Sequence, residues 1–223
     1  MVDPGPRRAE PQPEAVDALV LAGGRGRRLG GQDKAAIRIE GRSLLDHVLA
    51  GVARTPAVTR TVVVGDVELP AGTPGAVRQL VEDPPGSGPV AAIDAGVRWL
   101  RGADCAPWTL VLAVDQPGAG AVVPALIQAT RTYDTVPPTV DALVPRDDAG
   151  RWQWLLAVYR TESLRRALDG LPRAQDAAMR RVFGALRVGD VSVDTSLLGD
   201  IDTPEDLARW SSQPPAPPAP KPD

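Results

Sequence analysis

The amino-acid sequence predicts an α/β fold, a Rossmann-like three-layer sandwich with a mostly parallel sheet. Strand-like and helix-like segments alternate along most of the 223 residues. The strand-like segments at 61–64 and 109–114 contain uninterrupted apolar runs, as expected of strands that helices cover on both faces. The first strand, at 18–21, leads into a glycine-rich loop. In sheets of this kind, ligands bind at the carboxyl ends of the strands.

Short apolar runs predict the strands, and segments with helical periodicity predict the helices. Pro89 and Pro204 each suit the first turn of a helix, and Thr203 suits the cap before Pro204. The sequence contains no internal repeat. We expect strands at 18–21, 61–64, 77–81, 109–114, 141–144, 155–159 and 186–193. We expect helices at about 43–54, 89–101, 122–133, 161–168, 174–183 and 204–210.

One α/β domain, residues 15–210, accounts for this pattern without a second domain. Residues 1–14 contain four prolines and no periodicity, which predicts a disordered lead-in. The proline-rich residues 211–223 predict an extended, disordered tail. The alternative for this tail is a ligand for a proline-binding domain.

The composition excludes several classes of protein. Hydrophobic residues are 43% and charged residues 24% of the chain, as in a soluble globular protein. The net charge of −3 argues against a nucleic-acid partner. No apolar run approaches the ~20 residues of a membrane span, and the N-terminus has no apolar signal core. The single cysteine, Cys105, cannot form an internal disulfide. We therefore expect a cytoplasmic protein with no membrane partner.

The loop after the first strand predicts a phosphate site. Glycines let backbone N–H groups approach an anion, and cations add charge and bidentate hydrogen bonds. A flexible surface turn is the alternative, but such a turn does not usually follow a buried strand. The residues concerned are Gly23, Gly24, Gly26, Gly30 and Gly31, interleaved with Arg25, Arg27, Arg28 and Lys34.

Two common phosphate-loop patterns do not match this loop. The Walker pattern requires Gly-Lys-Ser/Thr, whereas Lys34 follows Asp33 and precedes Ala35. The dinucleotide fingerprint requires a third glycine at the position that Leu29 occupies. The sequence therefore predicts a third kind of phosphate loop.

The run LAGGRGRRLGGQDKA, residues 21–35, resembles the signature of the molybdenum cofactor guanylyltransferases. That family belongs to the superfamily of sugar-nucleotide-type nucleotidyltransferases, which implies a fold of the nucleotide-diphospho-sugar transferase type. The resemblance implies an enzyme that transfers GMP from GTP to molybdopterin or molybdenum-bound molybdopterin and releases pyrophosphate. It also implies Mg²⁺ as cofactor and transient contacts with molybdenum insertion proteins and molybdoenzymes.

A second strand-end site follows the strand at 77–81. Gly86 and Gly88 allow close approach of a flat base, and Asp83 can accept hydrogen bonds from a ribose or a base. A plain strand-to-helix turn is the alternative. The family's EDxxxxxGPLAG segment, which lines its guanine nucleotide site, resembles Glu82, Asp83 and Gly88 to Ala91.

Asp115 marks the third strand-end site. A carboxylate at the end of a buried strand is costly unless it is paired or binds a metal, and Mg²⁺ takes one or two carboxylates plus phosphate oxygens. A solvated strand-end aspartate is the alternative. In the family this position is the Mg²⁺-binding Asp of an Asp-x-Pro motif, matched here by Asp115 and Pro117. The glycines Gly118 and Gly120 that follow predict a more mobile loop than in the family.

The C-terminal third carries further candidates. The motif from Gly199 to Leu207 resembles the family's closing motif, which often has asparagines where Asp200 and Asp202 stand. Asp202 is a candidate second metal ligand, with a substrate contact as the alternative. The segment 153–160 resembles the family strand that lies toward the second substrate. Trp152 and Trp154 beside it offer flat faces for a pterin ring, with packing as the alternative. His47, the chain's single histidine, is expected to pack its helix.

The resemblance implies a specific set of site residues for the transfer. An acceptor phosphate oxygen attacks the α-phosphorus and is already an anion, so no strong general base is needed. The expected catalytic residues are Arg28, Lys34 and Asp115. The expected nucleotide-binding residues are Leu21, Ala22, Gly23, Gly24, Gly31, Lys34, Asp83, Gly88 and Asp115.

Other interpretations of the same sequence stay open at this stage. Within the fold, a molybdopterin cytidylyltransferase would read Ala-Ala-Gly where this chain has Ala22 to Gly24, and Arg-Pro-Lys where it has Gln32 to Lys34. A phospholactate guanylyltransferase is a further alternative. Outside enzymes, the chain could be a nucleotide-binding regulatory module or a scaffold that uses the proline-rich tail.

Overall fold

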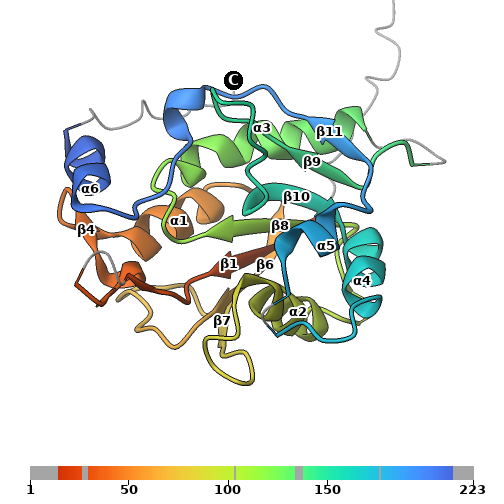
Figure 1. Cartoon of the computed structure of the whole chain (residues 1–223), viewed down its shortest axis with the longest axis horizontal. Helices are drawn as coiled ribbons and strands as arrows, with labels where there is room; N and C mark the ends of the chain where they lie inside the picture. The colour runs from red at the N-terminus through yellow and green to blue at the C-terminus, as the bar shows by residue number, and fades with distance from the viewer. Residues whose placement is uncertain (1–14, 27–29, 103, 134–137, 176, 213–223) are drawn as a thin grey trace, which may run out of the picture.

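The computed structural model describes residues 15–26, 30–102, 104–133, 138–175 and 177–212. The predicted lead-in at 1–14 and all but the start of the predicted tail lie outside these residues, as does Arg28. Figure 1 shows one sheet with helices on both of its faces. In the described part of the chain, no helix has the length and apolar character needed to cross a membrane.

A seven-stranded, mostly parallel sheet forms the middle layer, in the order β11-β9-β10-β8-β1-β6-β7. Only β10 runs antiparallel, to both of its neighbours. The central pairing is long: all six residues of β1 have parallel partners in β8. The strands are β1 (Val16–Leu21), β6 (Val58–Val64), β7 (Val77–Leu80), β8 (Trp108–Ala113), β9 (Ala142–Val144), β10 (Leu156–Arg160) and β11 (Val188–Asp190).

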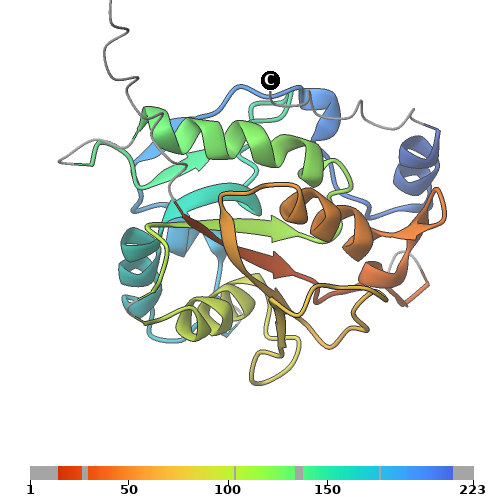
Figure 2. The same cartoon turned by 180° about the vertical axis from the view of Figure 1, so that it is seen from behind.

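Helices cover both faces of this sheet (Figures 1 and 2). The helices α1 (Leu44–Ala53) and α3 (Ala119–Thr132) pack on one face. The other face carries α2 (Pro89–Trp99), α4 (Thr161–Asp169) and α5 (Met179–Phe183). The alternation of side chains along a strand explains both layers. Val16, Ala18 and Val20 of β1 face the first core, and Leu19 and Leu21 face the second.

This architecture confirms the predicted fold class. The helix predicted at 204–210 is α6 (Pro204–Ser211), which begins with a capping box between Thr203 and Asp206. It lies outside the two helical layers, beside β4 (Arg38–Ile39) in Figure 1.

Two predicted elements are about half as long as expected or shorter. The strand predicted at 186–193 is only β11, because its parallel partner β9 offers three residues, Ala142 to Val144, to pair with. The helix predicted at 174–183 is reduced to α5, because the backbone of Ala178 is extended (φ −71°, ψ 131°).

The glycines after Asp115 serve close packing. The helix predicted from residue 122 begins at Ala119, so Gly118 is its N-cap and Gly120 lies in its first turn. A Cβ added at Gly118 would lie 2.2 Å from the carbonyl oxygen of Leu197, and one at Gly51 of α1 would lie 2.2 Å from the Cα of Gly120. These glycines therefore let α1, α3 and the C-terminal segment approach each other behind Asp115.

The sequence patterns missed two small antiparallel pairs before α1. β2 (Arg25–Gly26) pairs with β3 (Gln32–Asp33), and β4 pairs with β5 (Arg42–Ser43). Strands of two residues are too short to show a hydrophobic period. The first pair shapes the phosphate loop.

Candidate active site

The carboxyl ends of the central strands are tied together at one edge of the sheet. The backbone N–H of Ala22 donates to Val64 (2.8 Å), and that of Val114 donates to Leu21 (2.9 Å). The C-terminal segment joins them, because the N–H of Ile201 donates to the carbonyl of Asp115 (2.9 Å). The loops after β1 and β8 and the closing motif therefore meet in one place, as the strand-end rule predicts.

The two described ends of the predicted phosphate loop, Arg25–Gly26 and Gln32–Asp33, pair as short antiparallel strands. Gly30 and Gly31 have φ of 72° and 78°, a conformation that favours glycine. The pairing of β2 with β3 then returns the chain to the strand ends. Asp33 caps the following 3₁₀ turn, Lys34–Ala36, by accepting from the N–H of Ala35 (3.0 Å). This turn places the Lys34 side chain at the edge of the sheet.

Lys34 forms the centre of the site. Its Nζ lies 2.7 Å from Oδ2 of Asp115 and 2.5 Å from Oδ1 of Asp202. The Lys34 side chain is 13% exposed. Burial alone would lower the pKa of Lys34, but the hydrogen bonds and charges of Asp115 and Asp202 outweigh it and raise that pKa. The ammonium ion therefore stays charged between the two carboxylates.

A third carboxylate, Asp200, lies close to this group. Gln116 donates from Nε2 to Oδ1 of Asp200 (3.0 Å). Burial is the main cause that raises the pKa of Asp200, and the charges of Asp115 and Asp202 add to it, against the hydrogen bond from Gln116. The site thus gathers more negative than positive charge, as a cation-binding site requires.

Two carboxylates around one ammonium ion fit a magnesium site. Within the described residues, no group of three or more His, Cys, Asp or Glu side chains is arranged to hold a metal ion. Mg²⁺ does not need such a cage, since it binds through one or two carboxylates and completes its shell with phosphate oxygens and water. Lys34 shows that Asp115 and Asp202 converge on a single cation.

A glycine-lined cavity of about 270 Å³ lies on the β1 side of Asp115. Its walls come from the ends of β1 and β8, from the segment after β7 and from the start of α2. Of the predicted nucleotide-binding residues, Leu21, Gly23, Gly24, Gly88 and Asp115 line it, whereas Ala22, Gly31, Lys34 and Asp83 do not. The full set of lining residues is Leu21, Gly23, Gly24, Glu82, Gly86, Gly88, Pro89, Ala92, Ala113, Val114, Asp115 and Leu155.

Glu82, which matches the family segment but was not among the predicted nucleotide-binding residues, takes the place in this cavity that Asp83 was expected to fill. Asp83 is exposed, whereas Glu82 is 6% exposed. Oε1 of Glu82 accepts from the N–H of Gly86 (2.9 Å), while Oε2 is buried with no hydrogen-bond partner among the described residues. Alternation along the extended chain, with Val81 and Asp83 pointing out, was the signal that could have identified Glu82.

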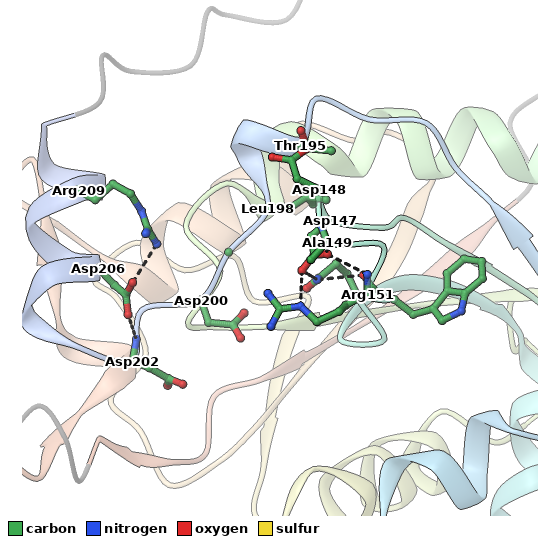
Figure 3. A pocket seen from close by; sticks show the side chains of 13 residues that line it. Asp147, Asp148, Ala149, Arg151, Thr195, Leu198, Asp200, Asp202, Asp206 and Arg209 are labelled. Atoms are coloured by element: carbon green, nitrogen blue, oxygen red, sulfur yellow. Dashed lines mark hydrogen bonds and ion pairs between the residues drawn. The ribbon is translucent and has the colours of Figure 1, made fainter.

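A second, larger cavity lies on the other side of the Lys34 group. We call it the charged cavity; its volume is about 680 Å³, and Figure 3 shows its walls. Asp202 and Asp200 line it, so Lys34 and its two carboxylates stand where the two cavities adjoin. Its lining residues are Asp147, Asp148, Ala149, Arg151, Trp152, Gln153, Thr195, Leu198, Gly199, Asp200, Asp202, Asp206 and Arg209.

The two candidate tryptophans have different surroundings. The Trp154 ring stacks on Phe183 with centroids 4.9 Å apart, which makes it a packing residue. Trp152 lines the charged cavity, and the guanidinium of Arg146 lies 3.7 Å from its ring centroid. His47 lines neither cavity and its Nε2 lies 3.1 Å from the carbonyl oxygen of Ile39, as expected of a helix-packing residue.

Comparisons with known proteins agree with this geometry. A family model described as "MobA-like NTP transferase domain" matches residues 18–191. The chain is 35% identical over 167 residues to the molybdenum cofactor guanylyltransferase of Acidiphilium cryptum (strain JF-5), covering 73% of this chain and 77% of that protein. It is 30% identical over 199 residues to the protein of the same name from Pseudomonas fluorescens (strain SBW25), covering 86% and 92%.

Solved structures show the same fold. The molybdopterin-guanine dinucleotide biosynthesis protein A from Archaeoglobus fulgidus has a TM-score of 0.57 at 23% identity, covering 87% of this chain and 96% of that one. The 2-C-methyl-D-erythritol 4-phosphate cytidylyltransferase from Thermus thermophilus has a TM-score of 0.60 at 21% identity, covering 88% and 97%. The chain therefore has the fold of the nucleotide-diphospho-sugar transferases.

Proposed function

Because the chain belongs to the MobA-like NTP transferase family and is a nucleotidyltransferase, we propose that it is a Mg²⁺-dependent guanylyltransferase. Its proposed reaction transfers GMP from GTP to molybdopterin, with or without bound molybdenum. The products are the molybdopterin guanine dinucleotide and pyrophosphate. The names of the relatives from Acidiphilium cryptum and Pseudomonas fluorescens support the choice of guanine and of this acceptor.

The observation that carries this proposal is the position of Lys34. Its ammonium joins Asp115, which lines the glycine-lined cavity, to Asp202, which lines the charged cavity. A nucleotide in the first cavity and an acceptor in the second would meet at this group. The site thus has two substrate compartments and one charged junction, as a transfer between two phosphate-bearing substrates requires.

The chemistry at the junction is a displacement at phosphorus. An oxygen of the acceptor phosphate forms a bond to the α-phosphorus of GTP, and the bond from that phosphorus to the β-phosphate bridging oxygen breaks. Pyrophosphate leaves with the bonding electrons. The attacking oxygen is already anionic, so the residues must neutralise charge and align the two substrates.

The roles of the residues follow from their places. Asp115 and Asp202 would hold Mg²⁺, which when bound draws phosphate oxygens together and neutralises their charge. Lys34 would then turn its ammonium from these carboxylates to the phosphates of the nucleotide. The backbone at Gly23 and Gly24 can approach the phosphates closely because these residues have no side chain. Arg28, which lies outside the described residues, stays a predicted phosphate ligand.

Guanine recognition is the proposed role of Glu82. A buried carboxylate oxygen without a hydrogen-bond partner is unfavourable, and a donor from a ligand would satisfy it. Guanine presents N1–H and a 2-amino group as donors along one edge. The transient contacts with molybdenum insertion proteins and molybdoenzymes stay predictions.

The experiment that tests the proposed function measures pyrophosphate release and product mass with the full chain. GTP and CTP are compared, each with Mg²⁺ and molybdopterin. We expect rapid pyrophosphate release with GTP and a product heavier than molybdopterin by one GMP unit. Preference for CTP would favour a cytidylyltransferase, and GTP binding without pyrophosphate release would favour a regulatory module.

A further inference from the structure

The charged cavity poses a problem for an acceptor that carries a phosphate. Carboxylates outnumber cationic side chains along its walls, where Arg151 and Arg209 stand against five aspartates. A phosphate monoester dianion would be repelled by these acids unless a cation faced it directly. The cavity therefore needs a cationic side chain with donors free for the acceptor.

Arg151 is the cationic side chain of this cavity that has most of its N–H donors free for an acceptor. Its Nε donates to Oδ2 of Asp147 (2.8 Å), while neither Nη atom makes a hydrogen bond or ion pair with any described residue. Its side chain is 80% exposed. A guanidinium with both Nη atoms free can bind two oxygens of one phosphate.

Arg209 is engaged through its terminal nitrogen instead. Its Nη2 donates to Oδ1 of Asp206 (2.9 Å), one turn away on α6. The other oxygen of Asp206 accepts from Thr203, which caps the same helix. Arg209 is therefore tied, from the last turn of α6, to the residue that caps the start of this helix, and it does not present two free Nη atoms as Arg151 does.

A hydrogen-bonded hairpin, residues 147–151, holds Arg151 in place. Besides Arg151 Nε, the Asp147 carboxylate accepts from the N–H groups of Ala149 (3.0 Å) and Arg151 (2.8 Å) and from Nε2 of Gln153 (3.3 Å). The backbone closes the turn, since the N–H of Gly150, at φ 75°, donates to Asp147 (2.8 Å). Fixing Nε before the ligand arrives reduces the ordering cost of binding.

The direction of the Arg151 side chain fits the reaction. In Figure 3 its terminal nitrogens point away from the hairpin, toward Asp200 and the inner wall of the cavity. Asp202 lines the same wall and binds Lys34 at the junction. A phosphate on Arg151 would thus enter the cavity that opens on the Lys34 group.

We propose that Arg151 binds the phosphate monoester of the acceptor and orients it for attack on the α-phosphorus. This inference rests on the proposed function, because it assigns a residue to the second substrate of that reaction. The neighbouring Trp152 ring lines the same cavity, so the hairpin suits an acceptor that joins a phosphate to a flat heterocycle.

The test measures steady-state kinetics of Arg151→Gln and Arg151→Lys with each substrate varied in turn. For Arg151→Gln we expect kcat/KM for molybdopterin to fall about 10- to 100-fold, the range for a lost charge-assisted contact. The KM for GTP should stay within about 2-fold, because nucleotide contacts are unchanged. For Arg151→Lys, kcat/KM for molybdopterin should lie between the values of the wild type and of Arg151→Gln. Lysine keeps the positive charge but cannot bind two phosphate oxygens with a planar guanidinium group.

Two matched arginine variants complete the kinetic test. Arg98→Gln removes a surface cation that pairs with Asp94 on α2 and lines neither cavity, so it should leave the kinetics of both substrates unaffected. Arg209→Gln should affect the acceptor less than Arg151→Gln. A raised KM for GTP in Arg151→Gln, or an acceptor defect confined to Arg209→Gln, would overturn the proposal.

A binding measurement separates this inference from the proposed function. Inorganic phosphate is titrated into the full chain with a non-hydrolysable GTP analogue and Mg²⁺, and its ³¹P line width reports binding. Broadening in the wild type that Arg151→Gln abolishes supports Arg151 even if no guanylyl transfer is found. Equal broadening in both proteins overturns the role of Arg151 while leaving the transfer reaction to its own assay.

Discussion

The glycine-lined cavity and the charged cavity adjoin at Lys34, yet they are built in different ways. Strand ends and glycines such as Gly23, Gly24 and Gly88 form most of the first. Charged side chains from a hairpin and from the C-terminal segment form most of the second. In the proposed reaction, the backbone of the first cavity would contact phosphates common to all nucleotides, and the side chains of the second would select the acceptor.

This difference separates what the superfamily shares from what distinguishes its members. Phosphate groups are chemically the same in every nucleotide, so backbone N–H groups at strand ends can bind them whatever the base. Acceptors differ, and a wall of side chains can change without disturbing the sheet. Glu82 is the exception on the nucleotide side, because it is a side chain placed where a base could be read.

Removing the Asp115 carboxylate, which lines the glycine-lined cavity and binds Lys34, should have the strongest effect of all. Asp115→Ala should abolish Mg²⁺-dependent turnover while leaving the melting temperature nearly unchanged, because Asp115 is at a strand end. Pyrophosphate release and thermal unfolding measure the two. Asp169→Ala, which loses only a surface pair with Arg101, is the control. Persistent turnover in Asp115→Ala would place the metal elsewhere.

Lys34→Met should have the next largest effect and tests the junction itself. Losing the ammonium should slow turnover by about 100-fold or more, as for other lost electrostatic donors. The same change should strengthen Mn²⁺ binding to the nucleotide-free protein, because no ammonium then competes for Asp115 and Asp202.

Paramagnetic resonance of Mn²⁺ and the pyrophosphate assay measure these two effects. Lys221→Met, which alters the only other lysine in the sequence, is the matched control and should behave as wild type. Unchanged Mn²⁺ affinity in Lys34→Met would show that the Lys34 ammonium does not compete with the metal for Asp115 and Asp202. Near-normal turnover would rule out a catalytic role for Lys34.

Glu82→Gln should have a smaller effect, on base choice. We expect the wild type to prefer GTP to inosine triphosphate, which lacks the 2-amino group, and the variant to lose about 10-fold of this preference. Competition assays for kcat/KM measure it. Asp83→Asn is the matched control, since Asp83 is adjacent but exposed. Loss of preference in Asp83→Asn alone would return base recognition to Asp83.

The smallest expected effects compare the two tryptophans. Trp152→Leu should raise the KM for molybdopterin a few-fold with little change in stability. Trp154→Leu should do the reverse, destabilising the fold by about 1–2 kcal/mol through the lost stack on Phe183. Denaturant unfolding and acceptor kinetics distinguish them. Equal rises of the KM for molybdopterin in Trp152→Leu and Trp154→Leu would contradict the separate roles, because both changes would then act through the packing of the hairpin on the core.

Sequence patterns were most informative where a feature is local. The strand and glycine loop from Ala18 to Lys34, and Asp115 after β8, could be predicted because each is defined by neighbouring residues. The choice between Glu82 and Asp83 could not, because it depends on which side of the extended chain faces the cavity. The start of α5 was likewise not predictable, because nothing in the residue type of Ala178 indicates its extended backbone.

The charged cavity was the least predictable part of the site. Arg151 and Asp147 lie in an ordinary polar turn, and no motif distinguished them from other surface residues. Their importance comes from the hairpin hydrogen bonds and from its position opposite Asp200 and Asp202 (Figure 3). Residues so far apart in the sequence carry no joint signal in a single chain.

The fold class and the strand-end carboxylates could be predicted from contiguous segments, and so could a glycine-rich loop suited to phosphate, because apolar periodicity, glycine content and strand boundaries are local properties of the sequence. Three features of the site are visible only in the folded protein: Lys34 bridges Asp115 and Asp202, Glu82 rather than Asp83 enters the glycine-lined cavity, and Arg151 lines the charged cavity. Each of these depends on the distance between side chains of separate elements, which exists only once the sheet has brought those elements together.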